Sequence, residues 1–203
     1  MLSVMRRTPI ALACAAALVA ACSKADKSAD SARGADSANA AASAAPATTT
    51  TPAAPAMTDA NIVAYLDAAN AADSAAGSIA AAKGTSAEVK SFGRDMMRDH
   101  HALRVAGQDF AKKANITPQP ASNDTTQAHG SKMADSLNAL ARGAGWDKAY
   151  IAGEVATHES VLNTAQTAMG ATQNAELKAL IQKAAPNIQA HLEHAKQIQS
   201  KLK

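Results

Sequence analysis

Cysteine and aromatic residues are scarce in this chain, and each scarcity excludes a class of protein. Of the 203 residues only two are cysteine, and aromatic residues make up 2%. Cys14 and Cys22 lie within or directly after the apolar N-terminal run, so the remainder offers no thiol for a disulfide, a nucleophile or a metal site. With so few rings, the chain also has little surface on which nucleic-acid bases could stack.

Concentrated positive charge is missing as well. The formal net charge is +3 at pH 7, and the basic residues are spread along the chain instead of forming a block. Without a basic footprint we expect no nucleic-acid partner. The sequence also lacks a Gly-rich phosphate-binding loop, a nucleophile elbow and a Ser-His-Asp arrangement, so no familiar motif indicates an enzyme.

Residues 1–21 have the features of an export signal. Arg6 and Arg7 supply the positive start, and an apolar run follows at residues 10–21. This run is too short for a permanent membrane-spanning helix, which needs roughly 20 residues. We therefore expect a signal peptide that directs the chain out of the cytoplasm.

The apolar run ends in LVAAC at residues 18–22, which resembles the bacterial lipobox. In that motif the cysteine receives lipid and becomes the new N-terminus, and Ser23 after it resembles the outer-membrane sorting pattern. We expect Cys22 to be lipidated and to anchor the protein in the bacterial envelope, facing the periplasm, at the outer membrane. The alternative is an ordinary signal peptide followed by a cysteine by chance.

Residues 22–57 are rich in Ala, Ser, Thr, Asp and Pro and show no apolar period. Such a segment buries nothing and contains prolines that interrupt helices, so we expect a disordered linker. A flexible chain of about 35 residues has an end-to-end distance of roughly 30–35 Å. That distance would hold a small domain clear of the lipid headgroups.

Residues 58–203 are expected to form the folded domain, because apolar and small residues recur there at steps of three and four. The expected helices cover about 58–83, 85–114, 131–142, 147–169 and 175–202. Two long helical hairpins, with the short helix in the connection between them, give an all-α fold. We expect a ferritin-like antiparallel four-helix bundle.

Local signals set the expected ends of these helices. Thr85 and Glu88 have the spacing of a capping box at the start of the second helix. The sequence at residues 116–129, with its two prolines, indicates a loop, and Gly170 is expected to end the fourth helix. Pro186 lies inside the last helix and removes one backbone donor, so we expect a kink there.

Ionisable residues interrupt the apolar stripe of every long helix. They are Asp73, His100, His158 and His191, with Glu154 one turn before His158 on the same face. Counted from the turns at 1.5 Å per residue, the members of each hairpin fall within about two helical turns of each other. The five side chains are therefore expected to meet in one interior layer. His101 lies off the stripe, whereas His194 could reach the layer from one turn beyond His191.

Three interpretations of this layer are open. The residues could form a buried hydrogen-bonded network that fixes helix register. Alternatively, the imidazoles with one or two carboxylates could bind one transition-metal ion, for which Zn, Cu and Fe are candidates. A small-ligand or haem pocket is the third reading. A di-iron centre is disfavoured, because Met97 and Ile188 stand where two Glu-x-x-His motifs would need glutamate.

Short motifs in the domain resemble a known bacterial family. The sequence AEVKSF at residues 87–92 is followed by Asp99-His100, and further motifs are Asp147-x-x-Tyr150 before His158-Glu159 and Pro186 before His191-Leu192. Over residues 58–202 these resemble exported or outer-membrane proteins whose domain is catalogued as of unknown function (DUF4142 type). The resemblance implies a ferritin-like fold and an envelope location, with no established reaction. Family members usually carry glutamate near Asp73.

The sequence therefore favours a non-catalytic envelope lipoprotein with a binding, structural or stress-related role. The alternative is a metal-binding or metal-dependent redox protein that uses the interior layer. Its membrane contact would be the lipid on Cys22, and no pattern in the sequence indicates a protein partner or a substrate.

Overall fold

The computed structural model describes residues 57–202. The predicted signal peptide, the predicted lipidation site Cys22 and the predicted linker up to residue 56 lie outside the described residues. Within them the chain forms five α-helices and no strand, so the predicted all-α fold is confirmed. The helices are α1 (Asp59–Lys83), α2 (Ala87–Lys113), α3 (Thr126–Ala139), α4 (Ala144–Ala171) and α5 (Ala175–Lys201).

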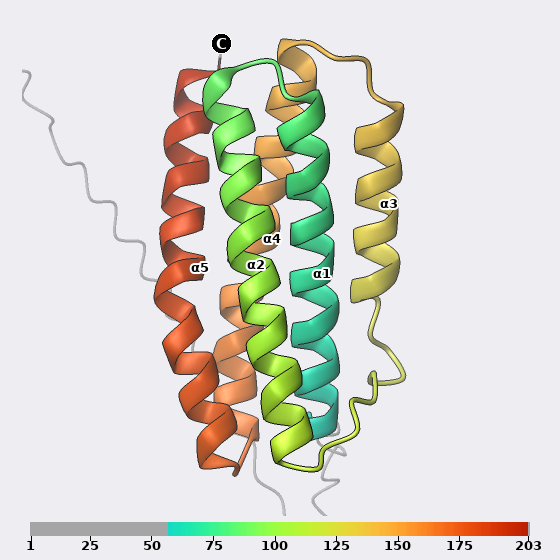
Figure 1. Ribbon diagram of the computed structural model, residues 1–203, viewed down its shortest axis with the longest axis vertical. Coiled ribbons are helices and arrows are strands. Elements are labelled where there is room, and N and C mark those ends of the chain that lie inside the picture. Colours follow the sequence, from blue (N-terminus) through green and yellow to red (C-terminus); the bar gives the residue numbers. More distant parts are fainter. Residues whose placement is uncertain (1–56, 203) are drawn as a thin grey trace, which may run out of the picture. The chain divides into compact units, whose positions relative to one another are not determined.

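Four long helices, α1, α2, α4 and α5, run side by side as an antiparallel bundle (Figure 1). The shorter α3 lies outside this bundle along α1, in the long connection between α2 and α4. This is the predicted arrangement of two hairpins with an extra helix between them, while the ferritin-like relationship stays a prediction. No helix among residues 57–202 combines the length and the apolar character that crossing a bilayer requires.

The α1–α2 hairpin begins as expected but turns differently at its tip. Thr58 caps α1 in a capping box with Asn61. Ser86, and not Thr85, caps α2, since its hydroxyl accepts from the Val89 amide at 3.1 Å. Thr85 instead donates to Asp147 of α4, through its amide at 2.8 Å and its hydroxyl at 2.7 Å. The expected capping box is therefore wrong because a carboxylate distant in sequence competes for Thr85.

Helix α3 begins five residues earlier than the sequence pattern indicated. Asp124 accepts from the amide and hydroxyl of Thr126 at 2.8 and 2.5 Å, which fixes the first turn without any apolar period. At the other end, the Lys83 ammonium donates to the carbonyls of Leu137, Asn138 and Leu140 at 2.9, 2.7 and 3.0 Å. A lysine of α1 thereby satisfies the carbonyls that end α3.

Helix α4 is longer than expected at both ends. It starts at Ala144, after Gly143 with φ 153°, a backbone conformation that favours glycine. It runs through Gly170, so the predicted stop at that glycine is wrong. The chain turns at Thr172, whose hydroxyl donates to Asp59 at 2.6 Å and accepts from the Asn174 amide at 3.0 Å. Helix α5 continues as one helix through Pro186.

The apolar core consists of two clusters, one toward each end of the bundle. One contains Trp146, Phe92, Ile151 and Ile198, and the other contains Ile62, Phe110, Leu177 and Ile181. On each long helix the two clusters are separated along the sequence by the buried ionisable residues Asp73, His100, Glu154, His158 and His191. The polar layer is therefore enclosed by apolar packing at both ends.

Helices α1 and α2 approach each other closely where two glycines face. A Cβ added to Gly77 would lie 2.6 Å from the Gly93 carbonyl oxygen, and one added to Gly93 would lie 2.7 Å from the Gly77 carbonyl oxygen. Small residues at this crossing compensate for a core in which alanine supplies little area to bury.

Candidate metal site

Three histidines from three helices meet in the middle of the bundle. His100 of α2 and His158 of α4 are 1% exposed, and His191 of α5 is 9% exposed. Their ring centroids lie 5.2 to 5.6 Å apart, and one nitrogen from each ring lies within 4.8 Å of the other two. Periodicity alone placed these residues on inward stripes, and the structure brings them to one point.

Each ring uses one nitrogen to contact an oxygen acceptor outside the cluster. His100 Nδ1 lies 2.9 Å from Asn70 Oδ1, and His158 Nδ1 lies 2.9 Å from the Glu154 carbonyl oxygen. His191 Nε2 lies 3.1 Å from Asp99 Oδ2. Because carbonyl and carboxylate oxygens only accept, each of these nitrogens carries the hydrogen when the ring is neutral.

The second nitrogen of each ring is left with a free lone pair. His100 Nε2, His158 Nε2 and His191 Nδ1 are buried, and none has a hydrogen-bond partner within residues 57–202. The three rings with an unpaired nitrogen are the same three that bring one nitrogen each to within 4.8 Å of the others. An imidazole that binds a metal through one nitrogen typically donates its other N–H to a carboxylate or a carbonyl, and all three rings show that pattern.

Burial keeps the imidazoles in the form that a metal needs. Burial, with a smaller contribution from the neighbouring imidazoles, lowers the pKa of His100 to about 3 and that of His158 to about 4. Burial also lowers the pKa of His191, although Asp99 acts against that effect. The rings are therefore neutral near pH 7, with lone pairs available to a cation.

The two predicted carboxylate members flank the cluster and do not enter it. Asp73 Oδ2 lies 3.5 Å from His100 Nδ1, and Glu154 Oε2 lies 3.5 Å from His158 Nδ1. Each carboxyl therefore lies near the Nδ1 atom of its histidine, which is the nitrogen that already contacts another oxygen. Burial raises the pKa of Asp73 to about 7 and that of Glu154 well above its ordinary value, so both favour the neutral form.

Sequence reasoning missed two residues that orient the rings. Asn70 lies one turn before Asp73 on the inner face of α1, and its amide accepts the closer contact from His100. Asp99 was recognised as part of a motif but not as the partner of His191. Asn70 lies one turn before Asp73, and Asp99 directly precedes His100. Closeness in sequence to a predicted site residue was the signal that could have identified both.

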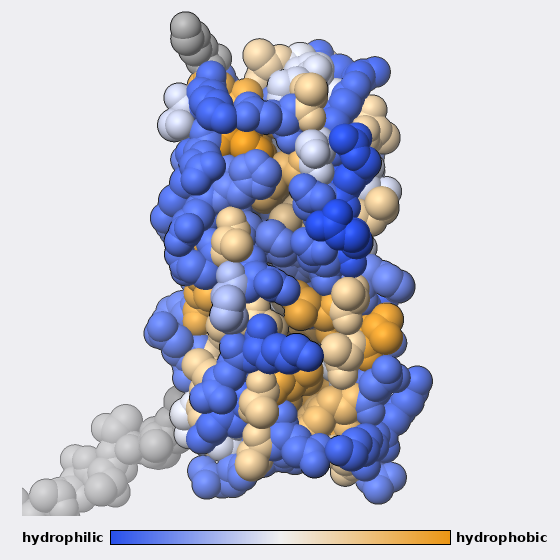
Figure 2. All heavy atoms as spheres, turned by 60° about the vertical axis from the view of Figure 1, so that its left-hand side comes forward, coloured by the Kyte–Doolittle hydropathy of each residue, from blue (hydrophilic) through white to orange (hydrophobic). Residues whose placement is uncertain are grey.

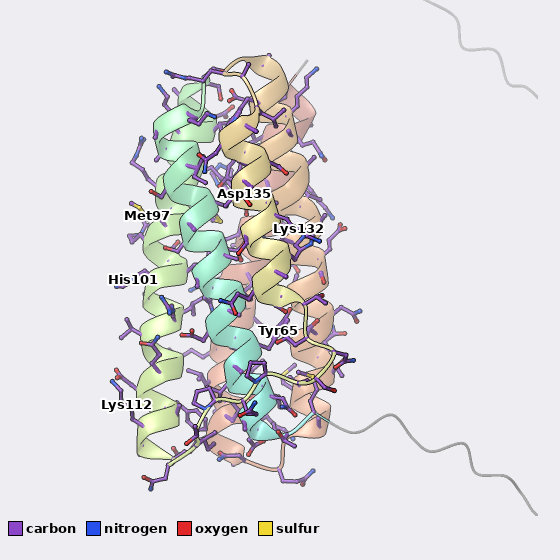
Figure 3. The ribbon with its side chains drawn as sticks, turned by 90° about the vertical axis from the view of Figure 1, so that its right-hand side faces the viewer. Tyr65, Met97, His101, Lys112, Lys132 and Asp135 are labelled. Carbon is purple, nitrogen blue, oxygen red and sulfur yellow. The ribbon has the colours of Figure 1, made fainter. Side chains whose placement is uncertain are left out.

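The remaining histidines considered lie outside the cluster. His101 is exposed and points outward from α2 (Figure 3). His194 is exposed on α5 and packs against the edge of Phe92, with ring centroids 5.3 Å apart. His194 therefore does not join the layer.

The donor set fits a single transition-metal ion better than the other two interpretations. A hydrogen-bonded network accounts for the nitrogen of each ring that contacts an oxygen acceptor. It leaves the second nitrogen of each ring without a partner in the described chain. The adjoining cavity of about 50 Å³ is far too small for haem. Three neutral imidazoles suit Zn, Cu and Fe, and no carboxylate of residues 57–202 joins the converging group as a di-iron centre would require.

Comparison with known proteins gives a family and a fold. No curated protein is similar enough to the chain to count as a relative. A solved structure described as "CopM in the Cu(II)-bound form" has a TM-score of 0.57 and 15% sequence identity, covering 72% of this chain and 98% of that chain. At that identity the likeness is one of fold alone. A family model matches residues 38–198, and the chain therefore belongs to the family described as "Domain of unknown function (DUF4142)".

Proposed function

We propose that this protein binds one divalent transition-metal ion through His100 Nε2, His158 Nε2 and His191 Nδ1. The observation that carries the proposal is the convergence of three buried imidazole rings, each of which has one nitrogen at an oxygen acceptor and one nitrogen without a partner in the described chain. The role is binding and not catalysis, in keeping with the absence of a recognised catalytic motif in the sequence.

Energetics favour an ion over an unfilled polar cluster. A buried polar group left without a partner costs roughly 1–3 kcal/mol of folding free energy. Three such nitrogens at one place would therefore lower the stability of an alanine-rich bundle substantially. A cation placed between them turns each lone pair into a coordinate bond. Metal binding would therefore stabilise the fold in addition to any role in metal handling.

Copper and zinc are the first ions to test. Sites made only of imidazole nitrogen suit both, and the general affinity order places Cu(II) above Zn(II). The fold neighbour is described in its Cu(II)-bound form, which makes copper a reasonable first choice. Fe(II) ranks lower because the cluster itself contains no carboxylate oxygen.

The decisive experiment measures bound metal with matched histidine variants. The full chain is stripped with a chelator, reloaded with Cu(II) or Zn(II), desalted and analysed for metal per chain. We expect one ion in the parent protein and none in the His100→Ala, His158→Ala, His191→Ala triple variant. The double variant His101→Ala, His194→Ala changes exposed histidines and should keep the ion. A parent protein that retains no metal would support the hydrogen-bonded network instead.

We also propose that the chain works in the bacterial envelope, attached to a membrane through a lipid on Cys22. Support comes from the lipobox-like residues 18–22 and the short apolar run before them. Intact mass of protein recovered from membranes should show a chain that begins at Cys22 with added acyl mass. In the Cys22→Ser variant, the protein should lose its membrane association, and an unlipidated mature N-terminus elsewhere would reject this location.

A further inference from the structure

A small apolar cavity adjoins the three-histidine cluster. It has a volume of about 50 Å³ and lies among α1, α2, α4 and α5. Its wall includes Leu162, Leu180 and Ile188. Of the three proposed ligands His100 belongs to the lining, and the other polar lining residues are Asp67, Asn70, Asp73 and Arg104. The cavity therefore extends from the apolar cluster that contains Ile181 to the ring of His100.

The cavity approaches the surface between α2 and α5. Gly107 of α2 and Leu180 of α5 belong to its lining, and both are only partly buried. A Cβ added to Gly107 would meet nothing within 4 Å, so the space beside this glycine is open. Hydrophobic side chains are visible in the lower half of this face, where the surrounding surface is hydrophilic (Figure 2).

The chain supplies three ligands to a metal and leaves a further coordination position. No carboxylate oxygen of the described residues belongs to the group of converging donor atoms. Asp73 and Glu154 contact the Nδ1 atoms of their histidines, and the Asn70 amide oxygen is held by His100. Three-histidine sites commonly keep their fourth position for a molecule from outside, whereas closed structural sites use four protein ligands.

We infer that the remaining coordination position is filled by a small exogenous molecule that enters through this cavity. The inference rests on the proposed metal site. The size of the cavity limits the occupant to about three to five heavy atoms, since one water needs roughly 10–15 Å³ of such space. Its mainly apolar wall disfavours strongly hydrated ions, so the class is a compact diatomic or triatomic ligand, neutral or a weakly hydrated anion, with a lone pair.

Azide is a suitable probe because it is a compact triatomic ligand and gives a charge-transfer band when it binds Cu(II). The full chain is loaded with Cu(II), its metal content is measured, and azide is then titrated. Gly107→Leu places a side chain in the open space of the cavity and touches no proposed ligand. Gly170→Leu is the matched control, since it is also a helical glycine with nothing within 4 Å of an added Cβ.

We expect all three proteins to hold one Cu(II), and azide to bind the parent and Gly170→Leu equally. Azide affinity should fall at least tenfold in Gly107→Leu. Ala184→Leu, which fills the cavity from α5, should reproduce the loss if Gly107→Leu fails to fold. Azide binding that is absent from a copper-loaded parent, or unchanged in both cavity variants, would overturn the inference and leave the metal site standing. A parent that holds no copper would overturn both.

Discussion

Asp99 directly precedes His100 in the chain, yet its carboxylate is the partner of His191 on another helix, with Oδ2 3.1 Å from Nε2. The same carboxylate pairs with the exposed Arg98 on α2. Hydrogen bonds from Arg98 and His191 lower the pKa of Asp99 against the opposing effect of burial. One short stretch of α2 therefore supplies both a proposed ligand and the group that orients another.

Removing this orienting carboxylate should weaken metal binding without abolishing it. We expect Asp99→Ala to reduce the affinity for Cu(II) or Zn(II) by about 10- to 100-fold, the usual effect of losing such an outer partner. Asp99→Asn keeps an acceptor oxygen and should recover part of the loss. Asp95→Ala removes the other partner of Arg98 and no contact of His191, so isothermal titration should give it the parent affinity.

The crossing of α1 and α2 should not tolerate a methyl group. In Gly77→Ala the new Cβ would lie 2.6 Å from the Gly93 carbonyl oxygen and 2.9 Å from Met96 Cβ, which forces the helices apart. We expect a loss of about 1–3 kcal/mol in the free energy of unfolding, measured by denaturant titration. Gly170→Ala meets nothing and should instead gain about 0.5–1 kcal/mol. Equal effects of the two changes would contradict the close approach.

Lys83 should hold the end of α3 in place. Its ammonium donates to three carbonyls at that end, so Lys83→Met should remove this donor from Asn138 and Leu140, while the Leu137 carbonyl keeps the indole N–H of Trp146. We expect amide hydrogen exchange in α3 to accelerate about tenfold or more, as for the loss of a charge-assisted bond worth about 1.5 kcal/mol. Lys132→Met, on the exposed face of α3 in Figure 3, is the control. Uniform acceleration in all helices would argue for a global effect.

The stability of the metal-free protein should depend on pH through two opposing groups. The pKa values of His100 and His158 fall from 6.5 to about 3 and 4, so the unfolded chain binds more protons at these sites and their contribution rises with pH between about 4 and 6.5. The pKa of Asp73 rises from 3.8 to about 7 and that of Glu154 also rises, so their contribution falls over the same window.

The isosteric pair Asp73→Asn, Glu154→Gln removes the second group and leaves the histidines. Because the pKa of His191 is lowered as well, we expect the parent to gain a little unfolding free energy between pH 4 and 6.5, whereas the double variant should gain distinctly more as the pH rises. Denaturant titrations at four or five pH values compare the two slopes. Equal slopes in the two proteins would show that the carboxyls are not held neutral, and a double variant that loses stability with rising pH would show that the histidine pKa values are not lowered.

Much of the fold and the three histidines could be predicted because helices translate sequence spacing directly into position. His100, His158 and His191 stand on inward stripes, and counting residues from each turn gives their heights along straight helices. Buried ionisable residues on apolar stripes are conspicuous in sequence. Metal binding at the cluster was one of three interpretations that the sequence left open.

Contacts between distant segments could not be read in the same way. Asp147 displaces Thr85 from its expected capping role, and Asp124 starts α3 in a polar stretch without periodicity. Which of Asn70 and Asp73 lies closer to His100 Nδ1 depends on side-chain rotamers at the helix crossing. These details are set by tertiary packing, which spacing along one helix does not encode.

X-ray absorption spectroscopy on the metal-loaded protein tests the central claim most directly. With one Cu(II) or Zn(II) per chain, we predict a first shell containing three imidazole nitrogens at roughly 2.0–2.1 Å, with the multiple-scattering pattern of histidine rings. The signal should vanish from the triple histidine variant. A first shell made only of oxygen, or one with sulfur from methionine, would contradict the account.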